Sequence, residues 1–159
     1  MPPVGPSDHV RGDGALAIVY ADLGCPACAT AWARLDAMEL RLCWRHFPIA
    51  SKRPRSPALH AAAEAVAAQS GPAFWSFVDS LYSDPGHCDD PHLWARVREL
   101  GLELDRFEAD RRSPAITARV QHDFEGGIRA GVMGTPTVFA VPGALGNEAA
   151  GALASLRSL

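Results

Sequence analysis

The sequence predicts an α/β fold, with a central sheet that is flanked by helices and interrupted by a helical insertion. Three observations support this class. Strand, helix and strand patterns follow one another over residues 15–49, helical segments occupy residues from about 56 to 112, and strand patterning returns after residue 134. Two strands joined by a helix form a βαβ unit, for which right-handed parallel pairing is the default. The expected sheet therefore contains a parallel pair.

Size and charge describe one ordinary globular domain. The chain has 159 residues, of which 48% are hydrophobic and 21% charged, and such a chain is long enough to bury a full core. We expect residues 1–14, rich in Pro and Gly, to be a flexible lead-in and residues 15–159 to be folded. A net charge of −3 offers no basic field for nucleic acid, so no nucleic-acid partner is expected.

The N-terminus gives an expectation about location. The stretch "MPPVGPSDHVRGDG" lacks the basic start and apolar core of a secretory signal, and the run "ALAIVY" is too short to span a membrane. For the sequence as given we expect a cytoplasmic protein without a membrane span. A processed chain or an excised fragment with the same sequence would fit a periplasmic or other extracytoplasmic location.

The first strand and helix place a cysteine pair at their junction. The run "ALAIVY" suits a strand that is buried on both faces. Pro26 falls in the first turn of the next helix, where a missing N–H costs nothing. Cys25 and Cys28 therefore lie at the N-terminal end of a helix, immediately after a strand. The alternating stretch "LRLCWRHFPI" predicts a second strand that Pro48 ends.

Capping residues and apolar periodicity divide the rest of the chain. Ser56 and Asp90 suit N-cap positions, and Gly71 and Gly101 suit helix ends. The predicted helices cover residues 56–71, 72–82, 90–101, about 104–111 and about 114–130. They are followed by a strand in "GTPTVFAV", a turn at 142–143 and a last helix over about 147–158.

Two kinds of site suit a cysteine pair with two residues between its members: half of a zinc centre, or a dithiol that cycles with a disulfide. A structural zinc centre needs four ligands, usually two tight pairs. The chain has only the pair Cys25 and Cys28, and the other candidate ligands are Cys88, His87 and His92. We interpret the stretch "GHCDDPH" as a surface turn and helix cap, and we expect no metal site.

Redox chemistry is the better interpretation of the pair. A helix N-terminus carries unpaired N–H groups and the positive end of the helix dipole, so a thiolate there is stabilised. Cys25 should be the exposed nucleophile and Cys28, one turn deeper, the more buried resolving thiol. A Cys-x-x-Cys motif beside a βαβ pattern is typical of a thioredoxin-like redox site.

A proline at the entry to the last strand suggests a second part of the site. Gly134, Thr135 and Pro136 precede a strand that should lie beside the first one. A cis Thr135–Pro136 bond would bend the chain against the cysteine pair and leave backbone groups free to pair with a substrate strand. The alternative is a trans proline that simply begins a strand.

These motifs give the sequence a specific likeness. It resembles the DsbA-like branch of the thioredoxin-fold family in the stretches "YADLGCPAC", "RHFP", "FWSFVDSLY", "DRFEAD" and "GVMGTPTVF", in order from about Ala15 to the C-terminus. The resemblance implies a thioredoxin fold with a helical insertion and a thiol-disulfide oxidoreductase. By this resemblance, Cys25 would attack a substrate disulfide and Cys28 would resolve the mixed disulfide. Thr135 and cis-Pro136 would face the Cys25–Cys28 disulfide.

The resemblance also implies partners and cofactor use. The substrates would be protein or peptide thiols and disulfides, and an unidentified redox partner or glutathione would recycle the pair. No cofactor would be needed beyond the Cys25–Cys28 disulfide. One rival is a glutathione-dependent isomerase or transferase, although such relatives commonly have Ser in the place of Cys25. A second rival is a non-catalytic binding module, which would leave Cys25 inaccessible to alkylation.

Three departures from the family pattern matter. Many members have an acidic residue six positions before the first cysteine, where this chain has Val19, although Asp22 fits a common pattern. DsbA itself has His in the dipeptide that is Pro26–Ala27 here, so we predict a less oxidising couple than that of DsbA. Only "GALG" separates 141–142 from the last helix, so we expect the family's closing hairpin strand to be short or absent.

The remaining candidates have structural interpretations. Cys43 falls in a predicted strand and is expected to be a small buried apolar residue. Cys88 should be more exposed, which leaves a regulatory or intermolecular disulfide open. His46, next to Phe47, is expected to be structural.

Overall fold

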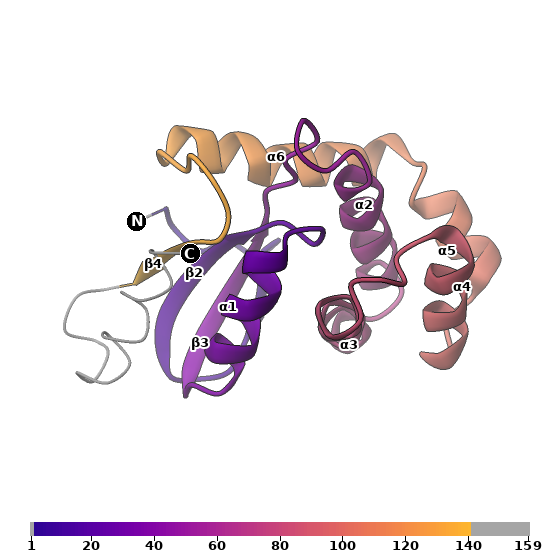
Figure 1. The fold of residues 1–159 in the computed structure, drawn as a ribbon, viewed down its shortest axis with the longest axis horizontal. Helices are drawn as coiled ribbons and strands as arrows, with labels where there is room; N and C mark the ends of the chain where they lie inside the picture. Colours follow the sequence, from indigo (N-terminus) through magenta and orange to yellow (C-terminus); the bar gives the residue numbers. More distant parts are fainter. Residues whose placement is uncertain (1, 141–159) are drawn as a thin grey trace.

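A computed structural model describes residues 2–140 of the chain (Figure 1). In order, the elements are β1 (His9–Arg11), β2 (Ala15–Ala21), α1 (Pro26–Asp36), β3 (Leu40–His46), α2 (Ser56–Ala67), α3 (Gly71–Ser83), α4 (Asp90–Glu99), α5 (Leu104–Asp110), α6 (Pro114–Arg129) and β4 (Thr137–Ala140). The predicted turn at 142–143, the predicted last helix and the closing hairpin lie outside the described residues.

The sheet has the order β1-β3-β2-β4. Strands β2 and β3 pair in parallel, as the βαβ pattern predicts, and β4 pairs antiparallel with β2. Residues 17–21 of β2 are all at most 2% exposed, which explains their uninterrupted apolar sequence. Helix α1 lies against the sheet, and α2 to α5 gather on the side away from β4 (Figure 1). Because β2 leads into α1 and pairs with β4, the cysteine pair and the segment before β4 meet at one end of the sheet.

The expectation of a flexible lead-in over residues 1–14 is wrong in part. Residues His9–Arg11 form β1, which pairs antiparallel with β3. The Arg11 guanidinium lies 4.7 Å from the centroid of the Trp32 ring and 4.8 Å from that of the Trp75 ring. These are cation–π contacts, and the two tryptophans lie in α1 and α3. The local composition of the N-terminus therefore could not reveal them.

We expect the substitution Arg11→Ala to lower the free energy of unfolding by about 1–2 kcal/mol, because it removes contacts with two tryptophan rings and with Asp36 and Asp79. Urea unfolding measures the change. The matched control is Arg34→Ala, since Arg34 is an exposed residue of α1. Equal stability of the two variants would contradict the anchoring of β1 by Arg11.

The insertion helices form as predicted, but two N-caps differ by one residue, and Gly71, expected at the end of the first of these helices, is instead the first residue of α3, because α2 ends at Ala67 and Ser70 caps α3. Ser56 and Asp90 are the first helical residues, and Asp89 accepts the capping hydrogen bond at the start of α4. The reason is that both predicted caps have tertiary partners. The Ser56 hydroxyl donates to Asp22 at 2.5 Å, and Asp90 accepts from Arg55 at 2.5 Å.

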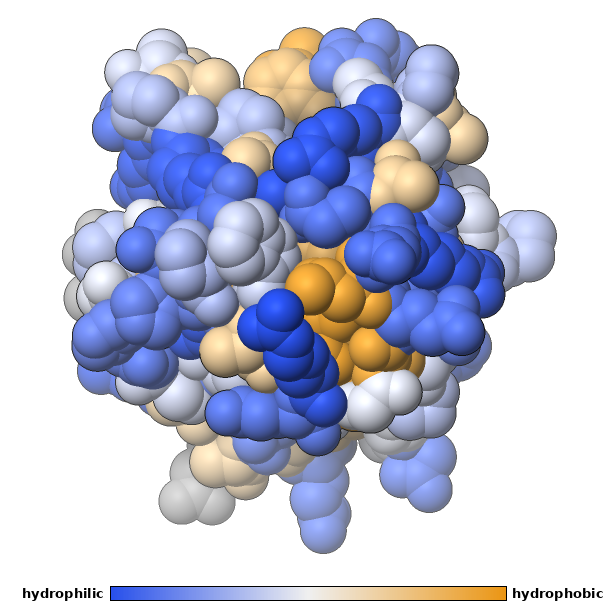
Figure 2. Space-filling view, turned by 90° about the vertical axis from the view of Figure 1, so that its right-hand side faces the viewer, coloured by the Kyte–Doolittle hydropathy of each residue, from blue (hydrophilic) through white to orange (hydrophobic). Residues whose placement is uncertain are grey.

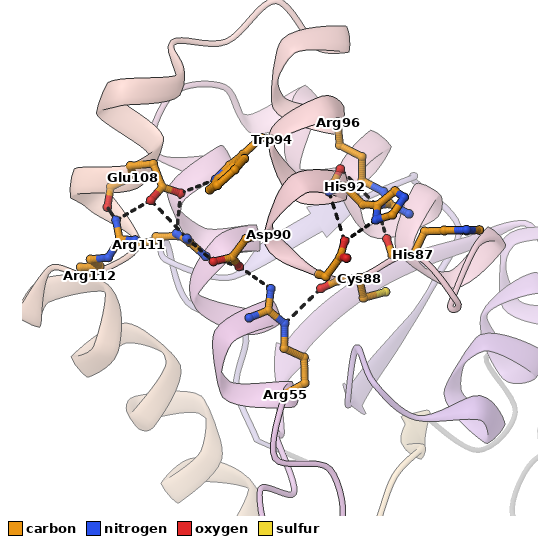
Figure 3. Close-up of polar contacts among 11 residues, drawn as sticks. Arg55, His87, Cys88, Asp90, His92, Trp94, Arg96, Glu108, Arg111 and Arg112 are labelled. Carbon is orange, nitrogen blue, oxygen red and sulfur yellow. Dashed lines mark hydrogen bonds and ion pairs between the residues drawn. The ribbon is translucent and has the colours of Figure 1, made fainter.

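Polar contacts hold the insertion helices together. Arg55 also donates to the carbonyl of Cys88 at 3.0 Å, and Arg111 of the segment after α5 pairs with Asp90 at 3.1 Å (Figure 3). Glu108 accepts a hydrogen bond from the Trp94 indole at 2.8 Å. The outer face of this part of the molecule is mostly hydrophilic around one apolar patch (Figure 2). These polar contacts join α4 and α5 to the start of α2, whose Ser56 and His60 contact the turn before Cys25.

Candidate active site

The cysteine pair lies at the start of α1, as predicted. Cys25 is the N-cap residue with extended backbone (φ −93°, ψ 119°), and Pro26 is the first helical residue. Cys28 follows in the first turn, and all four cysteines of the chain are reduced. A thiolate at Cys25 therefore meets the positive end of the helix dipole and the free N–H groups of the first turn.

The two thiols have opposite proton affinities. Hydrogen bonds from the thiol and the backbone of Cys28 lower the pKa of Cys25 to about 5, against a smaller opposing effect of burial. Burial, together with the neighbouring Cys25, raises the pKa of Cys28 well above its usual range. At neutral pH the site therefore holds a thiolate at Cys25 and a protonated thiol at Cys28, which is the arrangement that a nucleophile and a resolving thiol require.

The expected difference in exposure is wrong. Cys25 is 3% exposed and Cys28 is 2% exposed, so both side chains are buried. The carbonyl oxygen of Thr135 lies 3.6 Å from the Cys25 sulfur and helps to cover it. Sequence reasoning placed Cys25 at an open helix end, but the segment before β4 lies over that end. The two thiols differ in protonation and not in exposure.

The Thr135–Pro136 peptide bond is cis, so the alternative of a trans proline is wrong. Strand β4 begins directly after it and pairs with β2, with Thr137 opposite Tyr20. This pairing brings Thr135 to Cys25 although the two are far apart in sequence. The Thr135 hydroxyl is buried and has no hydrogen-bond partner among residues 2–140.

Asp22 anchors the turn before Cys25. Its carboxylate is 0% exposed. It accepts hydrogen bonds from the Gly24 N–H at 2.9 Å, the Ser56 hydroxyl at 2.5 Å, the Ile49 N–H at 3.0 Å and the Arg53 guanidinium at 3.2 Å. Burial raises the pKa of Asp22, but the hydrogen bonds outweigh burial and hold this pKa far below its usual range. The carboxylate is ionised and has four donors, so it positions the turn and is a poor proton acceptor.

Sequence reasoning missed a row of buried polar side chains on α2. Ser56, His60 and Glu64 follow one another at intervals of four residues, and they are 0%, 0% and 8% exposed. Residues four apart lie on one face of a helix, and this face of α2 points toward Asp22 and His46. The signal that could have found the row is the same spacing within the Ala-rich stretch "SPALHAAAE".

The other cysteines are placed as expected. Cys43 is 0% exposed, and burial raises its pKa to about 12. Cys88 is partly exposed, and burial raises its pKa as well. His46 is fully buried and hydrogen bonded to Glu64 and His60, in keeping with a structural interpretation.

The stretch around Cys88 forms a turn and a cap, as interpreted from the sequence (Figure 3). His87 pairs with Asp84 at 2.7 Å, and His92 contacts the cap residue Asp89. Within residues 2–140, the side chains that could surround a metal ion are instead His9, His46 and Glu64. In the same part of the chain, no helix has both the length and the apolar character that crossing a bilayer requires.

Similarities to known proteins agree with this geometry. Residues 17–155 match the family model of the DSBA-like thioredoxin domain. The chain is 36% identical over 148 residues to the Na(+)/H(+) antiporter NhaA of Herminiimonas arsenicoxydans and 36% identical over 151 residues to Na(+)/H(+) antiporter NhaA 3 of Salinispora tropica. Each match covers 87% of this chain but only 23% and 22% of those proteins. The chain thus spans less than a quarter of these relatives.

Solved structures share the fold. A thioredoxin-like oxidoreductase from Silicibacter pomeroyi superposes with a TM-score of 0.75 at 24% identity, over 98% of this chain and 95% of that one. The thiol-disulfide exchange protein alpha-DsbA2 from Wolbachia pipientis has a TM-score of 0.74 at 19% identity, over 96% and 85%. BdbD from Bacillus subtilis has a TM-score of 0.72 at 14% identity, over 95% and 94%. This chain therefore belongs to the DSBA-like thioredoxin domain family and has the fold of thiol-disulfide oxidoreductases.

Proposed function

We propose that the protein exchanges thiols and disulfides on protein or peptide substrates through Cys25 and Cys28. The observation that carries this proposal is the placement of Cys25 at the N-cap of α1 with Cys28 in the first turn and the Thr135 carbonyl 3.6 Å from the Cys25 sulfur. This placement gives the two thiols an asymmetry, because the pKa of Cys25 is lowered to about 5 and that of Cys28 is raised. A structural pair of thiols would have no need of this asymmetry, because a disulfide or a packing role is indifferent to which sulfur is ionised.

The proposed reaction needs no other redox group. The Cys25 thiolate attacks one sulfur of a substrate disulfide, the substrate S–S bond breaks, and the other substrate sulfur leaves and takes up a proton. Cys28 then loses its proton and attacks the Cys25 sulfur, which releases the second substrate thiol and closes the Cys25–Cys28 disulfide. Two electrons have passed from the pair to the substrate. In the oxidising direction the same steps run backwards.

Substrate is proposed to reach Cys25 along the segment before β4. Thr135 contacts the Cys25 sulfur through its carbonyl, and Met133, two residues earlier, is 98% exposed. An open apolar groove lined by Phe47, Phe124, Ile128 and Met133, among others, continues from this segment. An extended peptide that pairs with backbone groups near Thr135 would lie beside this groove, which is the β-strand addition mode of recognition.

The direction of exchange depends on the reduction potential. A Cys25 pKa of about 5 lies between the values of roughly 3.5 for DsbA and roughly 7 for thioredoxin, which favours a couple less oxidising than that of DsbA. Such a couple would donate disulfides in an extracytoplasmic compartment or reduce them in the cytoplasm. Equilibration with glutathione buffers measures the potential and decides between these roles.

Antiport is not proposed for this chain, because the shared segment is less than a quarter of the antiporters' length.

The dipeptide between the cysteines offers a direct test of pKa control. We expect the substitution Ala27→His to lower the pKa of Cys25 below about 5 and to raise the reduction potential by tens of millivolts, since about 30 mV corresponds to one pKa unit of thiolate stabilisation. The reason is that an imidazolium next to Cys25 favours the thiolate. Ala27→Asn, polar but uncharged, is the matched control. An unchanged or more reducing couple in Ala27→His would contradict the argument.

Two rivals are separated by simple assays. A glutathione-dependent isomerase would turn over its substrate only with glutathione, whereas the proposed enzyme should reduce insulin with dithiothreitol as the electron source. A non-catalytic module would leave Cys25 unmodified by iodoacetamide in the folded protein. The 3% exposure of Cys25 makes this second test necessary, and we expect alkylation at a rate that follows the thiolate fraction.

A further inference from the structure

A chain of buried polar side chains leads from the sheet to the turn before Cys25. His9 Nε2 contacts Glu64 Oε1 at 2.5 Å, and the same oxygen contacts His46 Nε2. His46 Nδ1 lies 2.8 Å from His60 Nδ1, and the Leu23 N–H donates to His60 Nε2 at 3.0 Å. His46 and His60 are 0% exposed and Glu64 is 8% exposed. The proposed mechanism uses none of these side chains.

The contacts fix the tautomer of both buried histidines. Because His60 Nε2 accepts the Leu23 N–H, a neutral His60 carries its proton on Nδ1 and donates it to His46 Nδ1. His46 Nδ1 is then an acceptor, so His46 carries its proton on Nε2 and donates to Glu64. Burial lowers the pKa of His60 to about 4, in keeping with a neutral ring. His60 Nε2 also lies 3.5 Å from Asp22 Oδ1, but its contact with the Leu23 N–H is shorter and assigns this nitrogen as the acceptor.

The end of this hydrogen-bond chain that lies at His60 contacts the turn at residues 22–25, which presents Cys25. The Asp22 N–H faces the Cys28 sulfur at 3.4 Å, and the Cys25 N–H donates to the Asp22 carbonyl at 3.0 Å. The Gly24 N–H donates to the Asp22 carboxylate. The Leu23 N–H is the one donor of residues 22–25 whose acceptor comes from α2, and that acceptor is His60. An unpaired N–H buried at this point would loosen the turn, since buried backbone donors need partners.

We propose that His60 and His46 are positioning residues of the redox site, which hold the turn at residues 22–25 through a tautomer-locked hydrogen-bond chain that ends on Glu64. This inference rests on the proposed function of Cys25. The chain passes no proton to the thiols, because it reaches them only through backbone N–H groups. Its effect is to keep Cys25 at the end of α1, where the dipole and the N–H groups act on the sulfur within the first turn.

The alternative to this hydrogen-bond chain is a metal ion bound by His9, His46 and Glu64. A metal would need the lone pair of His46 Nε2, which would move the His46 proton to Nδ1 and invert His60. His60 Nε2–H would then face the Leu23 N–H, two donors 3.0 Å apart, and would have to turn toward Asp22 Oδ1, which lies 3.5 Å from this nitrogen, leaving the Leu23 N–H without its acceptor. An imidazolium at His46 produces the same clash. Metal binding and the intact chain therefore exclude each other, and the observed contacts favour the chain.

Two substitutions at one position separate the roles of the His60 nitrogens. The amide oxygen of Gln in His60→Gln can take the place of Nε2 and accept the Leu23 N–H, whereas His60→Asn reaches only the place of Nδ1. We expect His60→Asn to raise the Cys25 titration midpoint by about one pH unit and to slow its attack on a disulfide about tenfold, with His60→Gln close to the unmodified protein. The matched control is His122→Asn, an exposed histidine on α6.

Equal shifts in His60→Asn and His60→Gln, or no shift in either, would overturn the positioning role. Long-range ¹H–¹⁵N correlation spectra of the unmodified protein test the tautomers without any substitution. We expect lone pairs on His60 Nε2 and His46 Nδ1, unchanged by added Zn²⁺. The opposite tautomers would contradict the proposed hydrogen-bond chain. Stoichiometric retention of Zn²⁺ with loss of the His46 Nε2 proton would also contradict it. These spectra do not depend on thiol chemistry, so failure of the proposed function shows separately, as an ordinary Cys25 titration in the unmodified protein.

Discussion

The substitution Cys25→Ser is expected to abolish thiol-disulfide turnover, and Cys28→Ser is expected to accumulate mixed disulfides between Cys25 and substrate. Cys25 carries the lowered pKa, so its loss removes the attacking thiolate and should reduce the rate by on the order of 10³-fold or more. Loss of Cys28 leaves the first attack intact but removes the thiol that closes the ring. Insulin reduction measures turnover, and non-reducing electrophoresis detects the trapped adduct.

Cys88→Ser is the matched control for this pair, because Cys88 lies in the turn before α4 and makes its sulfur contacts there with the carbonyls of residues 84 and 85. It should leave turnover unchanged. Equal residual activity in Cys25→Ser and Cys28→Ser would show that the roles of the two thiols are wrongly assigned. Adducts that form in Cys25→Ser instead of Cys28→Ser would reverse them.

The substitution Asp22→Ala is expected to cost about 3–5 kcal/mol of unfolding free energy at pH 7, the range for removing one partner of a buried charged network. It leaves the Ser56 hydroxyl, the Arg53 guanidinium and two backbone N–H groups without their acceptor. Asp22→Asn should cost less, because its amide oxygen keeps part of this acceptor capacity. Urea unfolding measures both variants, with the exposed Asp13→Ala as the matched control.

The pH dependence of this loss has a definite sign. The pKa of Asp22 is lowered in the folded protein, so its contribution to stability is fully present above the ordinary carboxyl pKa of about 4 and disappears as pH falls below that value toward the folded pKa. The stability difference between the unmodified protein and Asp22→Ala should therefore shrink in acid below about pH 4. A difference within about 0.5 kcal/mol at pH 7 would contradict the anchoring role of Asp22.

Local patterns predicted the parts of the fold that have local causes. The apolar run of β2, Pro26 in the first turn of α1 and the two-residue spacing of Cys25 and Cys28 were sufficient for the βαβ unit and the position of the redox pair. The place of Thr135–Pro136 followed from one further inference, that the last strand pairs with the first. Each of these features depends on residues close together in sequence, or on a single pairing of strands.

The remainder depends on contacts between distant segments. Strand β1 is held by Arg11 between two tryptophan rings of α1 and α3. The burial of Cys25 follows from the carbonyl of Thr135, and the caps move by one residue because Ser56 has a partner in Asp22. Single-sequence patterns do not report such pairs, because the choice between a cap and a tertiary hydrogen bond is made only when both segments are in place.

An ultraviolet titration of the reduced protein, with the oxidised form as the blank, measures the pKa of the Cys25 thiol on which the proposed exchange reaction depends. The other thiols titrate far higher, since the pKa of Cys43 is raised to about 12 and those of Cys28 and Cys88 are also raised. We expect one thiolate transition with a midpoint near 5, assigned to Cys25 by its loss in Cys25→Ser. A first transition near 9, in a protein that cannot form the Cys25–Cys28 disulfide reversibly, would contradict the account.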